Sequence, residues 1–209
     1  KGKCIGTVDI RDTNPEKLSA MMVGRDVNFV VEKEEAKPGE VVLDIKDMVV
    51  ASKHHKNNAV NGVSLQVHRG EIVCIAGIDG NGQTEFVYGL SGLEPLKSGA
   101  ITMNGKDITH MPIRERLTSG MSHIPEDRHK HGLVLDYSLE DNIVLQRYFE
   151  PQFTNKLGFL KRKEIRKYAN RLIEQYDIRS GQGAITKARS MSGGNQQKVV
   201  LAKWLVRNI

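Results

Sequence analysis

Residues 77–84, GIDGNGQT, follow the pattern of a phosphate-binding loop, G-x-x-x-x-G-K-[ST], but Gln83 stands where the pattern has lysine. Glycines let the backbone curl so that successive N–H groups point inward, and the start of a helix adds the positive end of its dipole. Such a loop holds the phosphates of a nucleotide. Thr84 stands where a hydroxyl would bind Mg²⁺.

The glutamine should weaken this loop. A hydrogen bond to a charged group contributes about 1.5–3 kcal/mol, whereas a neutral one contributes about 1 kcal/mol, so we expect binding about tenfold weaker than with lysine. Hydrolysis should suffer more, because charge stabilisation is most of what a protein supplies in phosphoryl transfer. The sequence predicts a loop that holds phosphate and is poorly equipped to cleave it.

A second glycine motif, SGGNQQ, occupies residues 192–197 and precedes an apolar run. Ser192 is a natural N-cap, and Gly193 and Gly194 would expose the N–H groups of a helix start. Taken alone, the motif also fits an ordinary helix cap after a flexible turn.

The elements around these motifs read as a mixed α/β protein. Ile72–Ala76 is a continuous apolar run, typical of a strand buried on both faces of a parallel sheet. Asn104-Gly105 lies between two short alternating runs and predicts a tight hairpin. Further strands are expected over 41–50 and 61–67, with a short one ending at Pro125. Helices are expected over 84–90, after Ser138, over 165–176 and after Ser192.

The first forty residues have a different character. Residues 3–10 alternate well enough for a strand. A helix should follow, with Asn14 as N-cap, Pro15 at its first position and Gly24 at its end. Residues 31–40 are charged, contain Pro38-Gly39 and lack apolar periodicity, so a linker is expected there.

The composition of the chain is compatible with several classes of binding partner. The net charge is +6 and the pI about 9.3, compatible with nucleic acid, an anionic membrane surface or phosphate ligands. Basic residues concentrate in residues 156–171, which fit either a solvated helix face or a face near a membrane. Only 5% of residues are aromatic, so few rings could stack bases. Cys4 and Cys74 are expected to be buried free thiols, and no cluster supports a structural metal site.

Three ordered motifs carry a family resemblance. SGGNQQK followed by VVLAKWL resembles the signature motif of ATP-binding cassette (ABC) transporters, and GEIVCIAGIDGNGQTE resembles their Walker A region. In HIPEDRHKHGLV, Glu126 stands at the glutamine of the family's Q-loop. The chain is most similar to the second cassette of tandem ATPase subunits that import simple sugars or nucleosides, and GNGQ leans toward the nucleoside branch.

The resemblance implies a fold and a domain layout. The fold would be α/β, a P-loop NTPase cassette core, incomplete here, with an antiparallel β part and a helical subdomain over about 138–205. Residues 1–30 would be the closing segment of a preceding cassette, 31–40 a linker, and 41–209 the N-terminal part of the second cassette. An incomplete sheet would expose apolar faces of its central strands. The Walker B aspartate and catalytic glutamate would lie beyond Ile209, so this chain alone is expected to be inactive.

The resemblance also implies sites and partners. Cassettes pair head to tail, with each ATP between one Walker A loop and the partner's signature motif. ATP and Mg²⁺ would contact this chain's own loop, Gly77, Asp79, Gly80, Asn81, Gly82, Gln83, Thr84 and Glu85. The partner's ATP would contact the signature residues Ser192, Gly193, Gly194, Asn195 and Gln196. Ser52 stands at the place of the family's adenine-stacking aromatic, where His54 or His55 could substitute.

The implied partners are membrane permease subunits, the preceding cassette and, indirectly, a substrate-binding protein. No nucleic acid is expected, and the location would be the cytoplasmic face of the membrane. Two other hypotheses stay open. The chain could be a soluble ABC module that acts on nucleic acid or ribosomes, or a structural cassette that never binds nucleotide.

Overall fold

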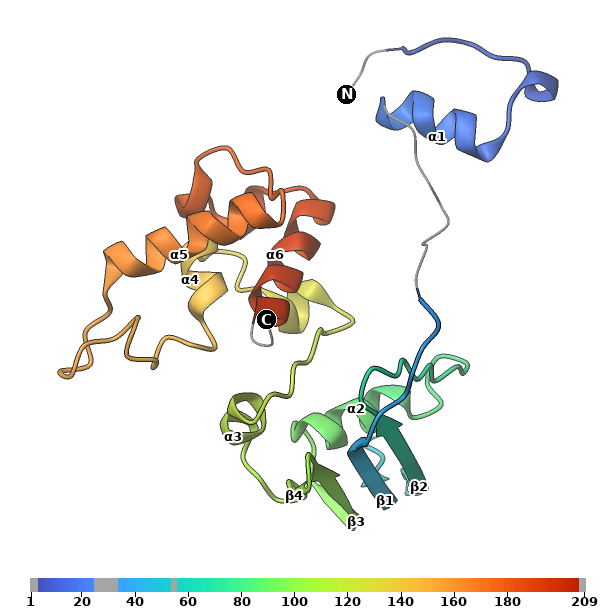
Figure 1. Ribbon diagram of the computed structural model, residues 1–209, viewed down its shortest axis with the longest axis vertical. Helices are drawn as coiled ribbons and strands as arrows, with labels where there is room; N and C mark the ends of the chain where they lie inside the picture. The colour runs from blue at the N-terminus through green and yellow to red at the C-terminus, as the bar shows by residue number, and fades with distance from the viewer. Residues whose placement is uncertain (1–3, 25–33, 54–55, 207–209) are drawn as a thin grey trace.

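The computed structural model describes residues 4–24, 34–53 and 56–206. Figure 1 shows three parts along the chain: an N-terminal segment with one helix, a sheet with one helix against it, and a group of helices that ends the chain. The phosphate loop, residues 77–84, belongs to the sheet part. The signature loop, residues 192–196, belongs to the helical part.

The N-terminal segment contains a short 3-10 helix, Ile10–Asp12, and α1, Pro15–Val23. Asn14 Oδ1 accepts a bond from the N–H of Lys17 at 2.8 Å, and Gly24 ends the helix with φ 78°, as predicted. The strand expected over residues 3–10 was wrong for the described residues, because residues 4–9 are irregular and pair with no strand among the described residues. The linker expected over 31–40 lies partly outside the described residues, and residues 34–39 have no regular structure.

The sheet has four antiparallel strands: β1, Val41–Ala51; β2, Asn58–His68; β3, Leu96–Met103; and β4, Lys106–Asp107. Their order is β2-β1-β3-β4. The predicted hairpin is confirmed, since Asn104 and Gly105 join β3 to β4 with φ of 48° and 77°. Helix α2, Gln83–Ser91, packs on β1 so closely that a Cβ on Gly89 would overlap the side chain of Met48. The core here comprises Ile45, Met48, Val50, Val60, Phe86, Ile101 and Ile108.

The segment before the phosphate loop departs from its prediction. Residues 71–78 form no strand, and Ile72 and Ile75 are 88% and 54% exposed. A buried parallel strand needs hydrogen-bonding neighbours on both sides, and the described sheet offers none to this segment. Cys74 is therefore exposed rather than buried, and Cys4 is exposed too. The short strand expected before Pro125 is also absent, because residues 121–125 pair with nothing in the described sheet.

The remaining helices surround a second core. After α3, Ile113–Thr118, come a π-helix, Arg128–Gly132; α4, Leu139–Val144; α5, Arg162–Gln175; and α6, Gly193–Leu205. Two 3-10 turns, Gly183–Ile185 and Ala188–Ser190, precede α6. The main buried side chains are Leu139, Ile143, Phe153, Ile165, Leu172, Val199 and Trp204.

The predicted start of α4 is confirmed, because Ser138 Oγ accepts from the N–H of Asp141 at 3.1 Å. The predicted amphipathic helix is confirmed in α5, which buries Ile165, Ala169 and Leu172. No described helix combines the length and the apolar character that crossing a bilayer requires.

Candidate nucleotide site

The phosphate loop is curled rather than extended. Gly80 and Gly82 have φ of 85° and 96°, the left-handed region that glycine enters freely. The N–H of Asn81 donates to the carbonyl of Ile78 at 3.2 Å, and the N–H of Phe86 donates to the carbonyl of Gly82 at 2.8 Å, which starts α2. A Cβ on Gly82 would overlap the carbonyl oxygen of Ala59 in β2. The loop therefore needs glycine at this point, and it presents its amides at the N-terminus of α2.

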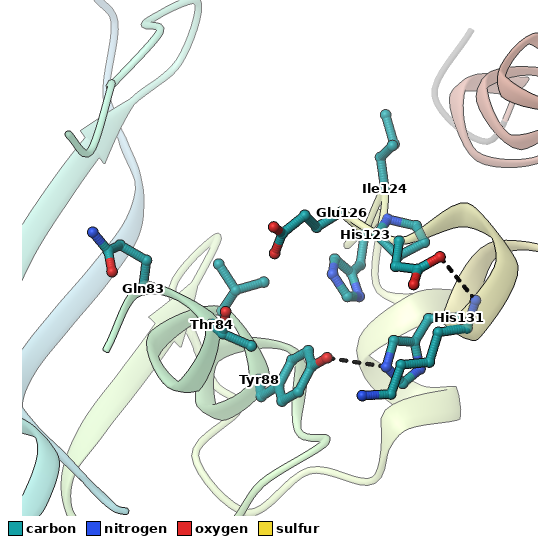
Figure 2. A pocket seen from close by; sticks show the side chains of 11 residues that line it. Gln83, Thr84, Tyr88, His123, Ile124, Glu126 and His131 are labelled. Atoms are coloured by element: carbon teal, nitrogen blue, oxygen red, sulfur yellow. Dashed lines mark hydrogen bonds between the residues drawn. The ribbon is translucent and has the colours of Figure 1, made fainter. Parts of the chain in front are cut away.

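Gln83 folds back along the loop. Its Nε2 donates to the carbonyl of Ile78 at 3.2 Å. It also lies so close to Gly77 that a Cβ there would overlap the amide nitrogen. Figure 2 shows the Gln83 side chain directed away from Tyr88, His123 and Glu126. The residue that replaces lysine thus closes the loop internally.

A cavity of about 480 Å³ lies between α2 and residues 123–131. This volume falls within the range of small-ligand pockets, about 300–1,000 Å³. Figure 2 shows Thr84 and Tyr88 on one side of it and Glu126, His123 and His131 on the other. The structure thus brings Glu126, the residue at the Q-loop position, to the same cavity as Gln83 and Thr84. Its full lining is Gln83, Thr84, Val87, Tyr88, His123, Ile124, Pro125, Glu126, Asp127, Lys130 and His131.

Hydrogen bonds order the far wall of this cavity. The hydroxyl of Tyr88 lies 3.0 Å from Nε2 of His131. Asp127 Oδ1 accepts from the N–H groups of Lys130 and His129, and these bonds lower the pKa of the Asp127 carboxyl. Burial, with a smaller contribution from nearby His131, lowers the pKa of His123. His123 therefore stays neutral at neutral pH.

The other side of the phosphate loop opens into a second cavity of about 510 Å³. Gly80, Asn81, Gly82 and Glu85 line it together with Ser52, which stands at the expected adenine position. His54 and His55, the candidate substitutes for the stacking aromatic, lie outside the described residues. Asp79 is exposed at the turn of the loop.

The signature loop begins α6 as predicted, although the Ser192 side chain caps no helix amide. Instead, Ser192 Oγ accepts from Nδ2 of Asn195 at 3.0 Å, and Asn195 Oδ1 accepts from the N–H of Arg179 at 2.9 Å. Ser192 and Asn195 line a cavity of about 910 Å³. A Cβ on Gly194 would meet nothing within 4 Å, whereas one on Gly193 would lie 3.0 Å from a guanidinium nitrogen of Arg128.

Gln196 faces inward. It is 5% exposed, and its Nε2 donates to the carbonyl of Ala188 at 2.9 Å. Its Oε1 accepts from Nε of Arg128 at 3.3 Å and lies 2.8 Å from Nε2 of His129. The sequence grouped Gln196 with the residues that face a partner. In the structure its side chain joins α6 to the π-helix instead.

Sequence reasoning placed none of Tyr88, Arg128, His129 and His131 at a nucleotide site. The available signal was the basic run RHKH directly after Asp127, but nothing in its spacing shows which helices it contacts. The cavity at Thr84 and the cavity at Ser192 share no lining residue. The phosphate loop and the signature loop therefore face different spaces.

The ABC transporter family matches residues 60–209, most of the chain. The chain belongs to the ABC transporter family. Among curated relatives, this ABC chain is 47% identical over 208 residues to the guanosine import ATP-binding protein NupO of Bacillus subtilis (strain 168), and 45% identical over 208 residues to the nucleoside import ATP-binding protein NupA of Lactococcus lactis subsp. cremoris (strain MG1363). All of this chain is covered in both alignments, but only 40% of each relative, so the chain spans about two fifths of their length.

Solved structures agree on the fold. The ABC chain is similar to a dimeric post-hydrolysis structure of the ATP-binding cassette MJ0796 bound to ADP and Pi, with a TM-score of 0.62 and 20% identity. The match covers 79% of this chain and 70% of that one. The expected cassette fold, with its antiparallel sheet and helical part, is confirmed.

Proposed function

We propose that this ABC chain is the nucleotide-binding part of an importer of nucleosides or simple sugars, with a weakened ATP site of its own. The curled phosphate loop, with left-handed Gly80 and Gly82 at the start of α2, carries the proposal. The names of the relatives, which describe nucleoside and guanosine import ATP-binding proteins, supply the substrate class.

The residues present fit the phosphates of ATP. The cradle admits no side chain at Gly82, and the amides of Gln83 and Thr84 begin helix α2. The hydroxyl of Thr84 would bind Mg²⁺, and Glu126 stands across the cavity from it. Bound ATP would supply the free energy for transport through its hydrolysis.

The same residues account for weak binding. Gln83 gives up its bond to the carbonyl of Ile78 if it turns toward a phosphate, and it brings no charge. Among the residues that line the Thr84 cavity, Lys130 is the one lysine, while Glu126 and Asp127 add negative charge. We infer that the site at this chain's own phosphate loop holds ATP with low affinity and hydrolyses it poorly.

The signature loop would serve another ATP, bound by the preceding cassette of the same polypeptide. Ser192 Oγ and the amides of Gly193 and Gly194 would contact it, Asn195 would hold Ser192, and Gln196 would position the helix from behind. Permease subunits and, indirectly, a substrate-binding protein complete the proposed assembly. It would lie at the cytoplasmic face of the membrane. The described chain alone is expected to be inactive.

The ATPase rate of the full-length protein with its permease subunits tests this arrangement. Gly194→Asp adds a carboxylate where a Cβ has open space, so a large loss of activity is expected at the partner's ATP. Gln83→Ala should leave most activity. Gln197→Asp, an exposed position on the same helix, is the matched control for charge. Activity that survives Gly194→Asp and disappears in Gln83→Ala would reverse the assignment.

The affinity of this chain's phosphate loop for ATP can be tested separately by titration with a fluorescent ATP analogue. Gln83→Lys restores the cation and should tighten binding about tenfold. Gln152→Lys adds the same charge at an exposed position of the helical part and should change little. Equal affinity of the Gln83→Lys variant and the unmodified protein would show that this loop does not hold the phosphates.

A further inference from the structure

The loop between α4 and α5 presents apolar side chains to solvent. In residues 154–160, which we call the apolar hairpin, Leu157 is 81% exposed and Phe159 is 69% exposed. Leu160 beside them is 38% exposed. Figure 1 shows this loop at the outer edge of the helical part. Single exposed apolar residues are common on protein surfaces, but three within four residues form a patch that indicates contact with something else.

Hydrogen bonds within the apolar hairpin define the backbone that presents these side chains. Asn155 Oδ1 accepts from the N–H groups of Leu157 and Phe159 at 3.0 and 2.9 Å. The N–H of Asn155 donates to the carbonyl of Phe159 at 3.0 Å, and Gly158 makes the turn with φ 86°. The N–H of Lys161 donates to the carbonyl of Phe153, which is buried in the helical core. The side chains of Leu157 and Phe159 thus project into solvent from a hydrogen-bonded turn.

Positive charge is concentrated in the sequence from this hairpin into α5. The stretch 156–171 contains one acidic residue, Glu164, and the cations Lys156, Lys161, Arg162, Lys163, Arg166, Lys167 and Arg171. An open groove of about 490 Å³ on α5 is lined only by Arg162, Lys163, Arg166, Lys167 and Asn170. Arg162 and Arg166 pair with Asp141 and Glu140 of the neighbouring helix α4. Among the described residues, Lys163 and Lys167 form no ion pair, so their charge is available to an anion.

We propose that the apolar hairpin inserts into the surface of a membrane that contains anionic lipid, and that the α5 groove contacts the lipid phosphates. Two large apolar side chains next to a cationic surface are the combination that binds such an interface, because insertion and charge attraction add. Nucleic acid would match the charge and would leave Leu157 exposed.

Vesicle co-sedimentation of the full-length protein, purified without its permease subunits, tests the proposal. Binding is expected to phosphatidylcholine vesicles with about 30 mol% phosphatidylglycerol, and to be much weaker without the anionic lipid. The Leu157→Ser/Phe159→Ser double variant should bind at least about tenfold more weakly. Ile185→Ser is the matched control, since Ile185 is 48% exposed on the helical part outside the hairpin. All replaced side chains are exposed, so unchanged circular dichroism and melting should accompany these results.

A second double variant tests how much the positive charge of α5 contributes to vesicle binding. Lys163→Glu/Lys167→Glu should weaken binding to anionic vesicles about tenfold, and raising salt from about 0.1 to about 0.5 M should do the same to the unmodified protein. A Phe159→Trp variant should show a blue-shifted emission only with anionic vesicles, above the constant signal of buried Trp204.

Two outcomes would overturn the proposal. One is equal vesicle binding by the unmodified protein and both double variants. The other is that the unmodified protein binds no vesicles at all and the Leu157→Ser/Phe159→Ser variant no longer co-purifies with the permease subunits. That result would show that the hairpin contacts a protein. Gln83→Ala should leave vesicle binding unchanged, because the proposed contact needs no nucleotide. A failure here is therefore distinguishable from a failure of the nucleotide site.

Discussion

The hydroxyl of Tyr88, on the helix that follows the phosphate loop, lies 3.0 Å from Nε2 of His131 in the π-helix Arg128–Gly132. Figure 2 shows this pair closing one side of the cavity. At its other end, the same π-helix contacts Gln196 of α6 through Arg128 and His129. Five residues thus connect the helix of the phosphate loop with the helix of the signature loop.

We expect the contact between Tyr88 and His131 to be energetically coupled. A double-mutant cycle of Tyr88→Phe and His131→Ala, measured by urea unfolding, should give a coupling free energy of about 0.5–1 kcal/mol, the net contribution of one such hydrogen bond. Tyr137→Phe, at an exposed tyrosine, supplies the control with little change. A coupling energy indistinguishable from zero would mean that the pair does not connect the two elements.

Gln196 should contribute far more to stability than its neighbour Gln197. Gln196→Ala removes three contacts at a buried side chain and leaves the carbonyl of Ala188 with its bond from the N–H of Met191, so a loss of about 2–3 kcal/mol in the free energy of unfolding is expected. Gln197→Ala, exposed on the same helix, should change it by less than about 0.5 kcal/mol. Similar losses in the two variants would contradict the inward orientation of Gln196.

Alanine variants at Gly82 and Gly80 distinguish the cost of a steric overlap from the cost of backbone strain. Both have left-handed φ angles, so alanine costs each about 1 kcal/mol of conformational energy. A Cβ on Gly82 would also overlap the carbonyl oxygen of Ala59, while one on Gly80 has open space. Gly82→Ala should therefore lower the free energy of unfolding by at least about 2 kcal/mol more than Gly80→Ala. Equal melting temperatures of the two variants would show that the loop does not pack on β2 as described.

Lys203 should make stability rise at alkaline pH. It is 5% exposed, its Nζ donates to the carbonyl of Gly132 at 3.1 Å, and burial lowers its pKa from 10.5 to about 8. Below about pH 8 the folded protein carries the cost of a buried charge. As pH rises from about 8 to about 10.5, only the unfolded chain keeps the proton, so the free energy of unfolding increases by up to about 3 kcal/mol.

The Lys203→Met variant isolates this effect. It keeps the apolar stem and removes the charge, so it should be more stable than the unmodified protein at pH about 7, and the difference should shrink toward pH about 10. Urea unfolding of both proteins across this range measures the difference directly. A difference that does not depend on pH would mean that Lys203 is not buried as a cation.

The sequence by itself determined the features that depend on neighbours along the chain. The Asn14 cap, the Gly24 end of α1 and the Asn104-Gly105 hairpin all follow from local hydrogen bonds and from backbone angles that few residue types adopt. The curl of the phosphate loop at Gly80 and Gly82 is another such local feature. The motifs that indicated the family were also visible in the sequence alone.

Only the tertiary structure decided the features that depend on partners far away in sequence. Ile72–Ala76 has the composition of a buried strand, yet it forms none because no described strand pairs with it. Gln196 is indistinguishable from Gln197 in a sequence pattern, and the helix places one against Arg128 and His129 and the other in solvent. Whether a side chain is buried, paired or free to reach a ligand depends on which distant residues pack against it, and local sequence does not encode that.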